Sequence, residues 1–173
     1  MKTVATLQPL DRALAILNIV RKEGEHLIYS YRRVFAHPVT TTWVVNLEHD
    51  QEQAERLESF VSRFGRMQDT IADKLLPLWL ASLAEPVGSQ IETLNRAERL
   101  GVLADTIQWL EARKLRNRLV HEYAVEAADF AQDLNLAASY TPMLIDTCNR
   151  VRNDLQKRLA ISEDRLPLVF QDW

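Results

Sequence analysis

Apolar residues recur at intervals of three and four along most of the chain, which is the spacing that places them on one face of an α-helix. The first such stripe consists of Leu10, Ala13, Leu14, Leu17 and Val20. We therefore predict a helix from Leu10. Segment 25–36 can continue this helix or form a strand, because helical spacing and alternation both fit it in part; a helix is our prediction. His37 and Pro38 end the region, since a residue before proline avoids the helical conformation.

Segment 39–47 is rich in β-branched residues, which favours a strand. Thr40 or Thr41 could equally cap a short helix that carries Trp43 and Leu47. The pattern leaves these alternatives open.

The longest helical pattern runs from 51 to 84. Its apolar stripe consists of Leu57, Phe60, Val61, Phe64, Met67, Ile71, Leu75 and Leu78. Gly65 weakens the predicted helix, and Pro77 should kink or divide it, because proline has no N–H to donate.

Helix start signals organise the second half of the chain. Ser89 with Glu92 forms a capping box that opens a short helix ending near 100–101. Asp105 with Gln108 resembles a second box, opening a predicted helix over 106–124. A last helical region spans 127–159, and Pro142 predicts a kink or break in it.

Four main helices with short connections predict an all-α fold, an antiparallel bundle of four to five helices. The composition agrees, with 47% hydrophobic residues, four glycines and six prolines among 173 residues. We expect one domain over 1–173, of which 161–173 is an apolar C-terminal tail. This tail should dock on its own bundle or on a partner.

The net charge of −3 does not favour a general nucleic-acid binder, so an anion site must be local. The single cysteine, Cys148, excludes an internal disulfide and is expected to be a buried thiol. The N-terminal segment does not resemble a signal peptide. The apolar run 75–84 is about half as long as a bilayer-spanning helix. We therefore expect a cytoplasmic protein without membrane attachment.

Common catalytic motifs are missing from the sequence, including phosphate-binding loops, zinc-protease helices and nucleophile elbows. A di-metal bundle site needs two Glu-x-x-His motifs, and only Glu23 with His26 matches. We predict neither a metal site nor a cofactor, and we expect His26, His37 and His49 to be surface residues.

One segment, Arg113–Tyr123, collects four basic residues around a histidine. On a continuous helix one arc would carry Arg113, Arg116, Asn117, Val120 and His121, with Tyr123 beside Arg116. A plain structural explanation is that cations near a helix C-terminus favour the helix dipole, with His121 incidental.

The same side chains could also carry chemistry. An imidazole can move a proton, arginine can hold a phosphate, and an asparagine can orient either. These are the parts for metal-free cleavage of RNA by its own 2′-hydroxyl. Because one histidine supplies only one proton-transfer group, a two-fold dimer would be needed to supply both.

The stretch RNRLVHEY, Arg116 to Tyr123, resembles the Arg-x4-His-x-Tyr signature of the HEPN superfamily, in the branch paired with minimal nucleotidyltransferases. The resemblance covers roughly 57–123 and does not extend to the region before about Arg32 or to the tail. It implies a helical toxin that dimerises through the motif helices. Arg116 and His121 would be the catalytic pair and Asn117 their polar supporter.

The resemblance further implies that Tyr123 is the residue that a partner antitoxin adenylylates. We expect Arg113 and Arg118 to bind RNA phosphates. The sequence therefore predicts a metal-independent endoribonuclease of a bacterial toxin-antitoxin system, acting as a homodimer on RNA. The alternative is a noncatalytic helical adaptor, or substrate-binding subunit, for a nucleotidyltransferase partner.

Overall fold

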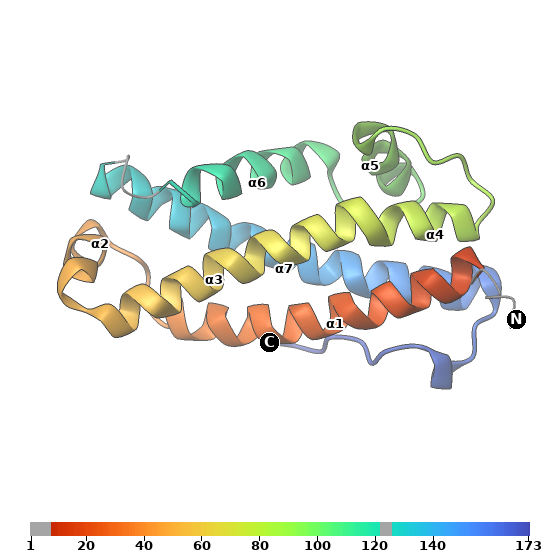
Figure 1. Ribbon diagram of the computed structural model, residues 1–173, viewed down its shortest axis with the longest axis horizontal. Coiled ribbons are helices and arrows are strands. Elements are labelled where there is room, and N and C mark those ends of the chain that lie inside the picture. The colour runs from red at the N-terminus through yellow and green to blue at the C-terminus, as the bar shows by residue number, and fades with distance from the viewer. Residues whose placement is uncertain (1–7, 122–125) are drawn as a thin grey trace, which may run out of the picture.

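The computed structural model describes residues 8–121 and 126–173, and the described elements are helical (Figure 1). The α-helices are α1 Pro9–Val34, α2 Thr41–Asn46, α3 Gln51–Thr70, α4 Leu76–Ser82, α5 Gln90–Arg99, α6 Thr106–Leu119 and α7 Ala127–Leu159. The described residues also form 3-10 turns at Leu47–His49 and Glu163–Arg165 and a π-helical turn at Ile71–Leu75. The predicted all-α class is confirmed.

The long helices run in alternating directions along the molecule (Figure 1). Helix α1 packs along α3 and α4, and α6 packs on α7 and α3. Helix α3, the π-helical turn and α4 follow one another along one side of the molecule (Figure 1). The C-terminal half of α6 lies beside α3, where Arg116 contacts Asp69.

The two segments that could be read as helix or strand, 25–36 and 39–47, are both helical over most of their length. Helix α1 continues to Val34, as predicted for segment 25–36. Residues Thr41–Asn46 form α2, whose N-terminus is capped by the Thr40 hydroxyl accepting from the Trp43 N–H at 3.1 Å. The strand alternative for 39–47 is wrong, because the cap satisfies the first turn of a helix.

The two prolines differ in their effect, since the division predicted for Pro77 is confirmed and a break at Pro142 is not. The 51–84 helix is divided at Ile71, ahead of Pro77, which sits in the first turn of α4. The missing proline N–H leaves the residue 73 carbonyl without its usual donor, and the wider π-helical turn accommodates this. At Pro142 the expected break does not occur, since α7 continues from Ala127 to Leu159.

The C-terminal tail docks on its own bundle, between α1 and α7. The Asn149 side chain both accepts from the Phe170 N–H at 2.8 Å and donates to the Phe170 carbonyl at 2.9 Å. Phe170 is buried, and the Arg21 guanidinium lies 3.9 Å from the centre of its ring. Trp173 packs edge-on against Tyr31.

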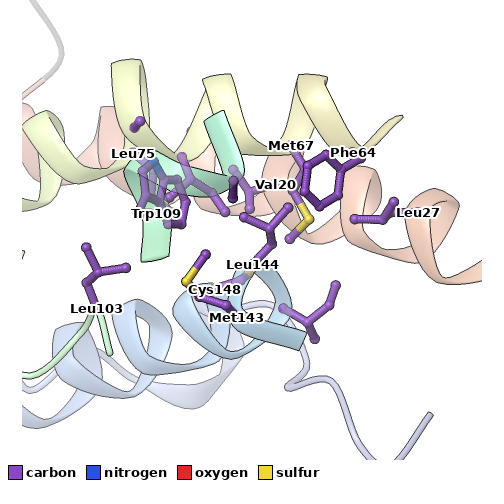
Figure 2. Packing of buried hydrophobic residues seen from close by; sticks show 14 of the residues in the cluster. Val20, Leu27, Phe64, Met67, Leu75, Leu103, Trp109, Met143, Leu144 and Cys148 are labelled. Atoms are coloured by element: carbon purple, nitrogen blue, oxygen red, sulfur yellow. The ribbon is translucent and has the colours of Figure 1, made fainter. Parts of the chain in front are cut away.

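The core runs the length of the bundle, and its largest buried side chains include Trp79, Trp109, Phe60 and Phe64. Figure 2 shows Trp109 pointing from α6 into the cluster that also contains Leu75, Leu144 and Cys148. Cys148 is buried as predicted, and burial raises the pKa of its thiol to about 12. Within the described residues, no helix is long and apolar enough to cross a membrane.

Candidate functional site

Helix α6 carries Arg116 and Asn117. An N-terminal cap and a buried apolar face hold this helix in place. The Asp105 carboxylate accepts from the N–H groups of Ile107 and Gln108, at 2.8 and 3.1 Å, so the Asp105 half of the predicted capping box forms. Its apolar face consists of Trp109, Ala112, Leu115 and Leu119. The Gln68 side chain also donates to the Trp109 carbonyl at 3.2 Å. Arg116 and Asn117 are therefore held at the surface of this helix.

The helix ends earlier than predicted, at Leu119 instead of 124. Leu119 is buried in the core, whereas Val120 is 60% exposed. Val120 and His121 form a turn, in which the His121 N–H donates to the Arg118 carbonyl at 3.0 Å. The continuous helix on which Arg116 and His121 were predicted to share an arc therefore ends before His121. Tyr123 lies outside the described residues.

Arg116 crosses from α6 to α3. Its Nη2 donates to the Asp69 carboxylate at 2.6 Å, and its Nη1 donates to the Asn117 side-chain oxygen at 3.2 Å. The stem of the side chain lies directly over Gly65, because a Cβ placed there would be 2.7 Å from Arg116 Nε and 3.2 Å from its Cγ. Asn117 thus contacts Arg116, and Gly65 and Asp69 of α3 complete the surroundings of its side chain.

An open groove of about 680 Å³ lies between α3 and the end of α6. Its charged lining residues are Glu58, Arg66, Asp69, Asp73, Lys74 and Arg116. Three are acidic and three are basic, so the groove has no net formal charge. Binding of an anion there depends on where individual cations lie, and a general positive field does not contribute.

The other predicted site residues lie apart from this groove. Arg118 forms a two-pronged ion pair with Asp133 of α7, with Nε–Oδ2 and Nη2–Oδ1 distances of 3.0 and 2.8 Å. The hydrogen bond to Asp133 raises the pKa of Arg118 further. Arg113 is half-buried, and His121 is exposed. None of these three lines the groove that Arg116 borders.

Sequence reasoning missed the α3 wall of the site. Asp69 and Arg116 are 47 positions apart, and no local pattern connects them. Gly65 was noticed only as a weak point in a helix, although a glycine inside a strong helical stripe can also indicate close approach of another side chain. No local pattern distinguishes Arg66 or Lys74 from other charged residues of the chain.

The single Glu-x-x-His match does not assemble a cluster. Glu23 accepts from the Thr70 hydroxyl at 3.1 Å, and partial burial raises the pKa of its carboxyl group. His26, His37 and His49 are exposed, as predicted. In the part of the chain that the structure describes, no three His, Cys, Asp or Glu side chains gather as metal ligands would.

Comparison of the chain with protein-family models, with curated proteins and with solved structures finds no match. The assignment of a function therefore depends on the motif and on the geometry around it.

Proposed function

We propose that this protein is a metal-independent endoribonuclease of the HEPN type, the toxin of a bacterial toxin-antitoxin pair. The observation that carries the proposal is the placement of Arg116. Its guanidinium is oriented by Asp69 and Asn117 at the edge of an open groove, and His121 is exposed just beyond the same helix. An oriented arginine and, five positions along the chain, a solvent-accessible imidazole are the kinds of groups that RNA cleavage needs.

The reaction follows from these groups. The imidazole of His121 accepts the proton of an RNA 2′-hydroxyl, and the 2′-oxygen forms a bond to the adjacent phosphorus. The bond from phosphorus to the 5′-oxygen breaks, and that oxygen receives a proton from a second imidazole. Arg116 stabilises the charge that develops on the phosphate oxygens. The products are a 2′,3′-cyclic phosphate and a 5′-hydroxyl.

Arg116 has donors left for a phosphate. A guanidinium has five N–H donors, and the described contacts with Asp69 and Asn117 use two of them. Both members of the Arg116–Asp69 pair are partly exposed, at 30% and 38% of their side chains. A phosphate can therefore bind without first breaking the internal pair.

The second imidazole would come from a second copy of the chain. We propose a homodimer in which the ends of the two α6 helices meet across a two-fold axis, because a self-complementary interface brings two His121 side chains to one phosphate. Sedimentation should then give about twice the 20.0 kDa chain mass. A monomer that still cleaves RNA would rule out the shared site.

The proposed partner is a minimal nucleotidyltransferase that silences the toxin by transferring AMP to Tyr123. The added phosphate would repel RNA from Arg116 and occupy space beside it. Co-expression should raise the intact mass by one or more AMP units, whereas a Tyr123→Phe variant should stay active and unmodified. Silencing of the Phe variant with no mass change would instead mean inhibition by direct binding.

One observation favours the alternative, a noncatalytic adaptor for a nucleotidyltransferase. Arg116 and Arg118 each already bind an internal carboxylate, of Asp69 and of Asp133. Such internal ion pairs are also expected of arginines whose main role is structural. An adaptor, however, would leave RNA intact, whereas the nuclease would produce cleaved fragments. This difference separates the two functions experimentally.

The test is incubation of the purified protein with RNA in EDTA, followed by analysis of the ends of the fragments. Cleavage should persist in the chelator and leave 2′,3′-cyclic phosphate and 5′-hydroxyl ends. Fragments with 5′-phosphate ends would point to attack by water and would exclude the 2′-hydroxyl route. Intact RNA at every protein concentration would favour the adaptor.

A further inference from the structure

We infer that Gly65 and Asp69, one turn apart on α3, form a seat that positions Arg116. Gly65 leaves room for the stem of the arginine, and Asp69 holds its guanidinium. The effect that we assign to this seat in RNA cleavage rests on the proposed function. The seat itself is a structural arrangement that can be measured without RNA.

The backbone does not explain the glycine. Among the described glycines, a positive φ occurs at Gly101 alone, so Gly65 has an ordinary helical conformation that any residue adopts. Glycine in a helix interior is less favourable than alanine. What prevents a side chain at this position is Arg116, whose Nε, Cγ and Cδ would lie 2.7, 3.2 and 3.5 Å from an added Cβ.

Stability does not explain the Arg116–Asp69 ion pair either. Arg116 and Asp69 are both partly exposed, and pairs of this kind contribute little to folding free energy. What the pair does achieve is orientation, because a carboxylate on a rigid helix restricts a long, flexible side chain to one direction. The neighbouring Arg118 makes a comparable pair with Asp133, on the α7 side of the same helix.

These contacts make Gly65 and Asp69 positioning residues. A Cβ at position 65 would push the arginine stem away from α3 and its guanidinium away from Asp69. Replacing Asp69 with asparagine would remove the charge that attracts the guanidinium while retaining a similar shape. In both variants Arg116 would remain present but would no longer point in one direction.

The first arm of the test measures the reactivity of Arg116 without RNA. Wild type, Gly65→Ala and Asp69→Asn are treated with phenylglyoxal, and the rate of modification at each arginine is followed by mass spectrometry. The rate at Arg116 should rise by about twofold to fivefold in both variants, as expected for loss of an exposed pair. The rate at Arg118 in the same samples should stay constant.

Asp133→Asn is the matched control, because it makes the same chemical change at the partner of Arg118. It should raise the rate at Arg118 and leave Arg116 unchanged. An Arg116 rate that stays at the wild-type value in Asp69→Asn overturns the seat. If Gly65→Ala does not fold, Asp69→Asn and its Asp69→Glu counterpart, which should restore slow modification, decide the question.

The second arm measures RNA cleavage. Asp69→Asn and Gly65→Ala should lower kcat by about tenfold to a hundredfold, as misplacement of a catalytic group does. KM should not rise in Asp69→Asn, because removing a carboxylate reduces repulsion of the phosphate, whereas Arg116→Ala should raise it. An unchanged kcat with altered labelling would remove the seat's role in catalysis. Absence of cleavage by wild type would count against the nuclease alone.

Discussion

Arg116 and Arg118 stand two positions apart on α6, yet each donates to a carboxylate on a different helix. Arg116 binds Asp69 of α3, and Arg118 binds Asp133 of α7. Successive polar residues of a helix point about 100° apart, so neighbours in a motif need not share a face. The two arginines therefore make separate contacts on different sides of α6. Of the two, Arg116 borders the groove and Arg118 does not.

The close approach at Gly65 gives a prediction about stability. Replacing glycine with alanine in a helix interior usually stabilises a protein by about 0.5–1 kcal/mol. In the wild-type background this gain should disappear, because the new methyl group would displace Arg116. In an Arg116→Ala background the same substitution should stabilise. Urea unfolding of the four proteins in this cycle measures the difference, and an equal gain in both backgrounds would contradict the contact.

At the scale of single residues, the sequence predicted what depends on close neighbours. Cys148 is buried and His26 is exposed, as their local patterns indicated. The partner of Arg116 could not be predicted, because Asp69 comes from a helix 47 positions away. Only the packing of α6 on α3 brings these two side chains together.

The two ends of α6 determine which residues of the basic segment lie on the helix. Its beginning at Asp105 was predictable, since a cap depends on residues two or three positions away. Its end at Leu119 was not, because the basic residues just before Leu119 are equally suited to the later turns of a longer helix. Leu119 is the last buried residue of α6, and its burial depends on the packing of other helices against it.

The cap of α6 is open to a direct test. Asp105→Ala should lower the free energy of unfolding by about 1 kcal/mol, because two N–H groups of the first turn lose their acceptor. Gln108→Ala is the control and should change it by less than about 0.5 kcal/mol. A large effect of the Gln108 variant would mean that the second half of the predicted capping box forms after all. Equal, negligible effects would show that water replaces the cap.

For the whole molecule, alternating helix directions and an apolar stripe on each long helix explain the bundle. The sequence predicted this class correctly but left the docking site of the tail open. The structure shows the tail in the groove between α1 and α7, where Phe170 packs against Gly24 and Asn149 holds its backbone. The tail is therefore part of the fold.

Two tail substitutions test this role. Phe170→Ala should lower the free energy of unfolding by about 3 kcal/mol, as for other buried aromatic residues. Leu168→Ala should change it by less than about 0.5 kcal/mol, because that side chain is 77% exposed. Urea unfolding measures both. If the two variants lose the same stability, or neither loses any, the tail does not contribute to the core.

We propose that His121 cleaves RNA together with Arg116 and without a metal ion. The most direct measurement compares wild type with His121→Ala for RNA cleavage in EDTA, at equal concentration and with matched circular dichroism spectra. Wild type should cleave, and His121→Ala should lose at least about a hundredfold in rate, as expected for a missing proton-transfer group. Because His121 is exposed in a turn, the variant should keep its helix content. Cleavage by His121→Ala at the wild-type rate would contradict the account.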